Sequence, residues 1–247
     1  MEAAPRLTFQ QGLHTIIYET VQSTRVIWTP SHLRARFRDF HPQSFSFHKD
    51  PVLILEDVWS QTELTEWRAA MNRQSWTSLS EMPAVARAFP NAGNWAKAPI
   101  AGPEGAKLLD RLSLPCLASY MESFPSIKGR QLSFSYYSYA AGDCLPTHDD
   151  TDDAYALTGT VKPTRRIAMV AYFHATWEPD WGGELIVYNQ AQGTGNRSVL
   201  TASHCIMPTP GSVVFFTVPR FHRVARVDQL AGENRRLSIA GWFMTEH

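Results

Sequence analysis

Residues 166–173 read Arg-Ile-Ala-Met-Val-Ala-Tyr-Phe and give the clearest indication of fold class. Both alternating sets of positions are apolar, as expected of a short strand that is covered on its two faces. A strand is predicted at 166–174, and further short strands, separated by turn residues, are predicted at 131–140, 184–189, 203–207, 212–217, 222–227 and 235–243. Strands of this length and spacing are typical of a β-sandwich or barrel rather than of a parallel sheet with crossover helices.

Helical patterns precede these strands. The strand-like run Val52–Glu56 leads to Ser60-Gln61-Thr62-Glu63, a capping-box pattern that predicts a helix through Met71. A second helical pattern covers Glu104 to Phe124 and should bend at Pro115, because proline disfavours a continuous helix. Helices followed by strands predict a mainly β fold in which N-terminal helices buttress one sheet.

Two segments between the predicted elements are expected to be loops. Residues 77–103 contain repeated Pro and Gly and show no regular pattern, and residues 151–164 separate two of the predicted strands. Long loops in compact domains are often functional. Either segment could therefore act as a lid over a site.

Length and composition favour one domain. The chain has 247 residues, of which 44% are hydrophobic, which is enough for a sizeable core. We expect this domain to cover residues 51–247, with its β core at 131–243. Residues 1–50 mix aromatic, histidine and arginine side chains without a clear period, so they could form either an irregular arm or extra strands.

Charge and cysteine content limit the partners and the compartment. Twenty-three Lys and Arg balance 23 Asp and Glu, so no global field draws the chain to nucleic acid or to an anionic membrane. Three cysteines are typical of free thiols in a reducing compartment. Neither a secretory signal nor a membrane span is evident, and we expect a cytoplasmic protein. No pattern predicts an oligomeric state.

A candidate metal-binding pattern lies between two of the predicted strands. Thr147-His148-Asp149-Asp150 contains His-x-Asp, and His222 follows 74 residues later. Two imidazoles and one carboxylate can bind one face of an octahedral ferrous ion and leave the opposite face open for a co-substrate and O₂. The pattern alone is weak, because roughly 0.4 chance matches are expected at this composition. A second match occurs at His48-Lys49-Asp50.

The surroundings of His148 strengthen the first match. An ordered set of motifs spans residues 131–243, namely Tyr139-Ala140-Ala141-Gly142, the His-x-Asp pattern, Gly182-Gly183-Glu184-Leu185, Gly211 to Phe216, His222 and Arg236-Leu237-Ser238. This order resembles the prolyl-hydroxylase-like branch of the iron(II)/2-oxoglutarate dioxygenases. The resemblance implies a double-stranded β-helix of the jelly-roll or cupin type, with an iron site at the mouth of the barrel.

The resemblance also implies roles for individual residues. His148, Asp150 and His222 match the iron ligands, and Arg236 matches the residue that holds the distal carboxylate of 2-oxoglutarate. A guanidinium can bind a carboxylate through two parallel hydrogen bonds, although Arg235 is a rival for this position.

Three further side chains are candidates for the co-substrate pocket. Ser238 lies on the same strand face as Arg236 and can add a hydroxyl. Tyr139 and Tyr172 match tyrosines that often line this pocket, and could equally belong to an aromatic core. The implied cofactors are Fe(II), 2-oxoglutarate and O₂, with ascorbate as an optional reductant.

The resemblance implies hydroxylation of an unactivated C–H bond, in a prolyl residue, a peptide or protein, or a small molecule such as a free amino acid. Asp150 stands where related halogenases have a small residue, which favours hydroxylation over halogenation. Some prolyl hydroxylases have lysine where this chain has Arg236, so the substrate is less firmly implied. Two alternatives stay open: a catalytically silent β-helix that only binds a ligand, and a nucleic-acid demethylase, which the balanced charge disfavours.

Overall fold

The fold is built around two antiparallel sheets. The computed structural model describes residues 16–18, 34–35, 41, 43–100, 102–125, 130–151, 163–192 and 198–246. The larger sheet has the strand order β2-β3-β11-β8-β13-β6-β5-β4, with β1 also paired to β6, and the smaller has the order β10-β9-β12-β7. The predicted mainly β fold, a double-stranded β-helix with N-terminal helices, is confirmed.

Most of the predicted strands lie close to their expected positions. In chain order, the strands that follow the helices are β6 (Arg130–Tyr139), β7 (Leu145–His148), β8 (Thr164–Tyr172), β9 (Leu185–Gln192), β10 (Ser198–Ile206), β11 (Val213–Thr217), β12 (His222–Val224) and β13 (Arg236–Thr245). The short strand β7 was not predicted, and β12 ends three residues earlier than expected.

Helices cover the outer face of the larger sheet. Helix α1 (Gln61–Asn72) follows β3 (Val52–Glu56) and begins with the predicted capping box at Ser60 and Glu63. The second helical pattern is not one bent helix: α3 (Gly102–Arg111) ends, and α4 (Pro115–Glu122) begins anew. Pro115 is the first residue of α4, where its missing N–H costs nothing.

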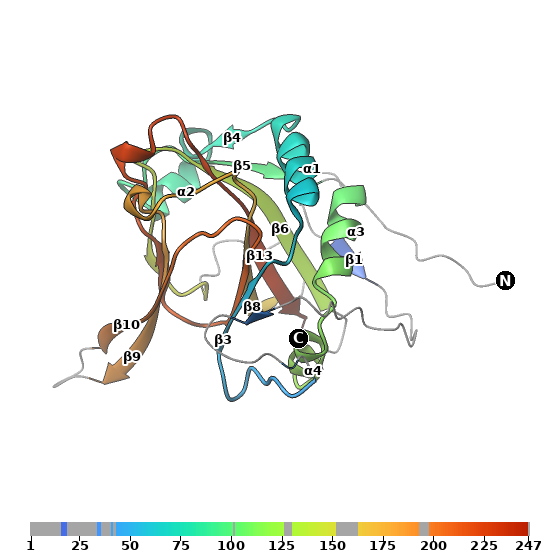
Figure 1. Cartoon of the computed structure of the whole chain (residues 1–247). Helices are drawn as coiled ribbons and strands as arrows, with labels where there is room; N and C mark the ends of the chain where they lie inside the picture. Colours follow the sequence, from blue (N-terminus) through green and yellow to red (C-terminus); the bar gives the residue numbers. More distant parts are fainter. Residues whose placement is uncertain are drawn as a thin grey trace.

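This arrangement explains why residues 166–173 are apolar at both alternating sets of positions. Ile167, Met169 and Ala171 pack in the core between the helices and the larger sheet. Ala168 and Tyr172 lie on the opposite face, in the core between the two sheets. Figure 1 shows α1 and α3 on one side of β6 and β13, and the β9–β10 hairpin extending away on the other. Both faces of β8 are therefore buried.

The expectation of an irregular loop at residues 77–103 was wrong. This segment contains β4 (Thr77–Ser78), the 3-10 helix η1 (Leu79–Glu81), α2 (Pro83–Ala88) and β5 (Ala96–Pro99). β5 pairs with β6, 30 or more residues further along the chain. Elements this short are set by tertiary pairing, which local patterns do not reveal.

Strands also occur within residues 1–50. β1 (Ile16–Tyr18) pairs with β6, and β2 (Arg34–Ala35) pairs with β3. The boundary at residue 50 stays a prediction, and the suggested lid at 151–164 falls largely on residues 152–162, outside the described part. None of the helices in the described ranges is long and apolar enough to cross a membrane.

Candidate active site

The smaller sheet brings the two halves of the predicted metal site together. His148 is the last residue of β7, His222 is the first residue of β12, and the two are direct partners in the antiparallel pair. Asp150 follows β7 with φ of 63°, in the left-handed region that Asp tolerates better than most residues. Strand pairing therefore places the two histidines side by side, although 74 residues separate them in the sequence.

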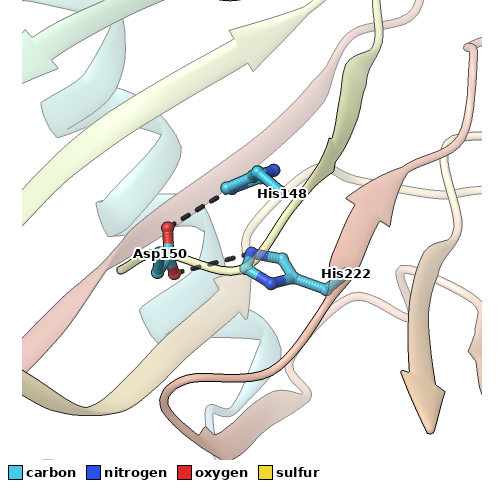
Figure 2. A group of neighbouring side chains, drawn as sticks. All are labelled: His148, Asp150 and His222. Carbon is cyan, nitrogen blue, oxygen red and sulfur yellow. Dashed lines mark ion pairs between the residues drawn. The ribbon is translucent and has the colours of Figure 1, made fainter. Parts of the chain in front are cut away.

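The three side chains converge (Figure 2). His148 Nε2 lies 3.3 Å from Asp150 Oδ1, and His222 Nε2 lies 3.6 Å from Asp150 Oδ2. One potential ligand atom from each residue lies within 4.8 Å of those of the other two. Two imidazole nitrogens and a carboxylate oxygen at this separation form the donor set expected for non-haem Fe(II).

Backbone carbonyls orient both imidazoles. Nδ1 of His148 is 2.8 Å from the Pro146 carbonyl, and Nδ1 of His222 is 2.9 Å from the Arg220 carbonyl. Donation from Nδ1 to these oxygens leaves Nε2 as the unprotonated lone-pair atom, which is the form that binds a metal. The residues present therefore fit an iron ion.

The electrostatics keep Asp150 and His222 in metal-binding protonation states at neutral pH. Burial alone would raise the pKa of Asp150, but the adjacent His148 and His222 and the hydrogen bond from Trp242 hold that pKa well below its usual range. Burial lowers the pKa of His222 to about 4, against the opposing charge of Asp150. The carboxyl is ionised and His222 is neutral.

Arg236 forms a second polar centre inside the barrel. Its side chain is 1% exposed, whereas Arg235 is exposed. The guanidinium donates from Nε to the Gly183 carbonyl at 2.8 Å and from its terminal nitrogens to Ser238 Oγ and Tyr172 Oη at 3.4 Å each. In the described ranges, no carboxylate forms an ion pair with Arg236.

The predicted pocket residues surround this guanidinium. Its central carbon lies 5.3 Å from the Tyr139 ring centroid and 4.9 Å from that of Tyr172. Tyr139 is the strand partner of Arg236, and Tyr172 is the strand partner of Ser238. Burial, offset only in part by the Arg236 charge, raises the pKa of Tyr139 well above its usual range, so its hydroxyl stays neutral. The structure thus brings all four side chains together.

Both centres face the space between the sheets. Tyr172 packs there with Val187 and Phe216, and the Phe216 ring lies 4.6 Å from the ring of His222. A buried cation on the larger sheet and a metal-ligating cluster on the smaller sheet therefore share one interior. Such an arrangement suits a dicarboxylate that binds a metal at one end and a guanidinium at the other.

Sequence reasoning missed three side chains at this site. Trp242 donates to Asp150, Arg165 contacts Asp150 and lies over Trp242, and the Phe89 ring lies 5.3 Å from the His148 ring. Trp242 follows Ser238 by an even number of residues on the same strand, so alternation could have placed it on the site face. Phe89 and Arg165 carry no comparable sequence signal.

Comparison with known proteins gives consistent matches. Residues 134–244 match the model of the 2OG-Fe(II) oxygenase superfamily. The chain is 33% identical over 114 residues to the Mus musculus prolyl 3-hydroxylase OGFOD1, and the match covers 45% of this chain but only 18% of that relative. The whole-protein activity of that relative therefore does not transfer directly.

Solved structures share the fold at low identity. A Pseudomonas putida prolyl-4-hydroxylase superposes with a TM-score of 0.51 and 18% identity, over 81% of this chain and 95% of that chain. HygX from Streptomyces hygroscopicus, with nickel and 2-oxoglutarate bound, superposes with a TM-score of 0.51 and 16% identity, over 80% of this chain and 84% of that chain.

Proposed function

Because the chain belongs to the 2OG-Fe(II) oxygenase superfamily, we propose that it hydroxylates an unactivated C–H bond of a prolyl residue in a peptide or protein. Fe(II) and 2-oxoglutarate are the cofactors that the family and the three-residue cluster imply. The overall reaction consumes 2-oxoglutarate and O₂ and yields succinate, CO₂ and the hydroxylated product. One oxygen atom enters succinate, and the other enters the product.

The buried Arg236 is the observation that carries this proposal. A guanidinium removed from water without a counter-charge is costly, and proteins pair such groups or use them to bind anions. Its bonds to Gly183, Ser238 and Tyr172 are all to neutral oxygens. Among the described residues no carboxylate pairs with Arg236, and a carboxylate from 2-oxoglutarate would supply a counter-charge.

The protein's own contribution is placement. His148, Asp150 and His222 would hold the iron, which supplies the O₂ chemistry when it is bound. Arg236 would fix the far carboxylate of 2-oxoglutarate, with Ser238 and Tyr172 orienting the guanidinium. The apolar interior around Tyr172 and Phe216 would exclude water from the reacting groups.

The proposed substrate class rests on the mouse relative, the prolyl 3-hydroxylase OGFOD1. Since the match covers only part of that protein, the position of hydroxylation is not carried over. The balanced charge of the chain gives no support to a nucleic-acid substrate.

Turnover measurements test the proposal. Purified protein with Fe(II), 2-oxoglutarate and O₂ is incubated with proline-containing peptides, free amino acids and a single-stranded oligonucleotide. We expect peptide-dependent succinate formation and a peptide mass gain of one oxygen, both absent in Asp150→Ala. Product from free amino acids or the oligonucleotide alone would contradict the substrate class. No succinate under any condition would contradict the activity itself.

A further inference from the structure

The face of the larger sheet that carries Arg236 and Ser238 continues beyond β13 onto β6 and β5. Ser238 pairs with Tyr137 of β6, and Tyr137 pairs in turn with Lys97 of β5. Direct partners in neighbouring strands lie on the same face of a sheet. Ala98, the next residue on β5, packs in the core between the helices and the larger sheet. Because successive side chains alternate between faces, Lys97 lies on the face of the active site.

A row of partly exposed residues crosses this face of the sheet. Ala240 of β13 pairs with Val170 of β8 on one side and with Ser135 of β6 on the other. Ser135 pairs in turn with Pro99 of β5. All four are partly exposed, whereas Tyr136, which faces the helices, is buried. We call these four residues the open row, because along them the sheet is incompletely covered.

The open row begins beside the metal site. Ala240 lies on β13 between Ser238 and Trp242. Ser238 contacts the Arg236 guanidinium. Trp242 donates a hydrogen bond to Asp150. A substrate that reaches the metal can therefore lie along the open row. Strands are about 4.8 Å apart, so β5 is about 10 Å from β13, and an extended peptide covers that distance in about three residues.

Lys97 carries a half-buried charge beside the open row. Its side chain is partly exposed, and burial lowers the pKa of the ammonium below its usual value. Among the residues that the structure describes, no ion pair involves Lys97. Its strand partners, Tyr137 and Thr77, offer hydroxyl groups rather than carboxylates. A ligand that brings a carboxylate to this position would therefore form a partly desolvated ion pair.

We propose that Lys97 binds an acidic side chain of the peptide substrate, about three residues from the target proline. This inference rests on the proposed function and narrows it to prolyl peptides that carry Asp or Glu at this distance. The ammonium is a compact charge on a flexible stem, so it can follow a carboxylate whose place varies among peptides. The strand spacing sets the distance but not the chain direction, so the acidic residue can precede or follow the proline.

A peptide library tests this preference. Peptides with capped ends, one fixed proline and randomised flanking residues are incubated with the protein, Fe(II), 2-oxoglutarate and O₂. Hydroxylated products are then sequenced by tandem mass spectrometry. We expect Asp and Glu to be enriched about tenfold among the products at about three residues from the proline, as for a hydrogen bond to a charged group. Capping removes the terminal charges, so the enrichment reports side chains alone.

Substitutions of Lys97 identify the group that recognises the charge. Lys97→Gln should abolish the acidic enrichment, and Lys97→Glu should enrich Lys and Arg at the same positions instead. A purely structural role of Lys97 would not reverse the preferred charge. Lys49→Gln is a matched control that should keep the acidic enrichment, because Lys49 is exposed in the turn before β3. Mn²⁺ affinity, measured from the electron paramagnetic resonance signal of the free ion, should be the same in every variant, since none of these substitutions alters a metal ligand.

The outcomes for Lys97 and for the proposed function can be told apart. Acidic enrichment that persists in Lys97→Gln, or that is absent with the unsubstituted protein although peptides are hydroxylated, would overturn the role of Lys97 alone. Succinate formation without any hydroxylated prolyl peptide would instead overturn the proposed substrate class.

Discussion

The chain contains the His-x-Asp pattern twice, and the two copies have different surroundings. His148 and Asp150 lie at the end of β7, beside His222 on the neighbouring strand. His48 and its neighbour Lys49 are exposed in a turn, and the His48 ring lies against Tyr120 at 4.9 Å. The same three-residue pattern thus occurs once in a polar cluster between two sheets and once at the surface.

The difference shows where a metal site gets its specificity. The pattern supplies two ligands, but the third comes from a strand that only tertiary folding brings alongside. Burial then matters in a second way, because it lowers the pKa of His222 to about 4 and keeps the ring neutral. The two copies therefore differ in their surroundings, and we expect iron to bind at the copy that contains His148.

Paired substitutions at the two copies give the largest expected contrast. His148→Ala removes a metal ligand and should lower 2-oxoglutarate turnover beyond the roughly 10–100-fold loss typical of an outer-shell partner. His48→Ala should leave turnover unchanged. Succinate formation and Mn²⁺ affinity are measured for both variants. Equal behaviour of the two variants would contradict the assignment of the metal site.

A second contrast concerns the two neighbouring arginines. Arg236→Ala should raise the KM for 2-oxoglutarate by several hundred-fold, equivalent to about 3–4 kcal/mol, because a buried charge-assisted contact is lost. Arg235→Ala should change this KM little, since that side chain is exposed. Mn²⁺ binding without 2-oxoglutarate should survive in both. A raised KM in Arg235→Ala alone would reverse the assignment.

Features that depend on one strand or helix could be predicted from the sequence, whereas pairing between distant segments could not. Alternation in residues 166–173 correctly indicated a strand buried on both faces. β5 was missed because its four residues are defined by pairing with β6, not by an internal pattern. The metal ligands could be proposed because an ordered set of motifs surrounds them.

The surroundings of the ligands were harder to predict than the ligands. Arg165 reaches Asp150 through a guanidinium stacked on Trp242, and Phe89 reaches His148 from the end of α2. Each contact joins side chains whose positions depend on several elements at once. Residues such as Arg165 and Phe89 can be identified once the distances between side chains in the folded chain are known.

Acid stability provides a third test, in which a buried histidine is compared with the exposed His48. Burial, reinforced by the Arg236 charge, lowers the pKa of His174 from 6.5 to about 4. Above pH 6.5 the ring is neutral in both folded and unfolded chains, and between pH 6.5 and 4 only the unfolded chain gains the proton. As the pH decreases from 6.5 to 4, this group should therefore lower the free energy of unfolding by about 3 kcal/mol.

Substitution isolates this contribution. Metal-free His174→Gln should show a shallower fall in the free energy of unfolding between pH 6.5 and 4 than the unsubstituted protein, as measured by denaturant titration. His48→Gln should retain the original slope. His222 carries a similar shift, so part of the slope should persist in His174→Gln. An unchanged slope in His174→Gln would contradict the inferred neutral state of this ring.

The smallest effect is expected for a motif whose backbone hydrogen bonds are local. At the start of α1, Glu63 N donates to Ser60 Oγ at 3.3 Å, and Ser60 N donates to Glu63 Oε2 at 2.8 Å. The hydrogen bonds of this capping box lie within four consecutive residues, so it could be read from the sequence, and Arg111 of α3 adds an ion pair to Glu63. Ser60→Ala should lower the free energy of unfolding by about 1 kcal/mol and leave Mn²⁺ affinity unchanged, as measured by denaturant titration and electron paramagnetic resonance. A change in Mn²⁺ affinity would show that α1 is coupled to the site, and would weaken the distinction between local and tertiary motifs.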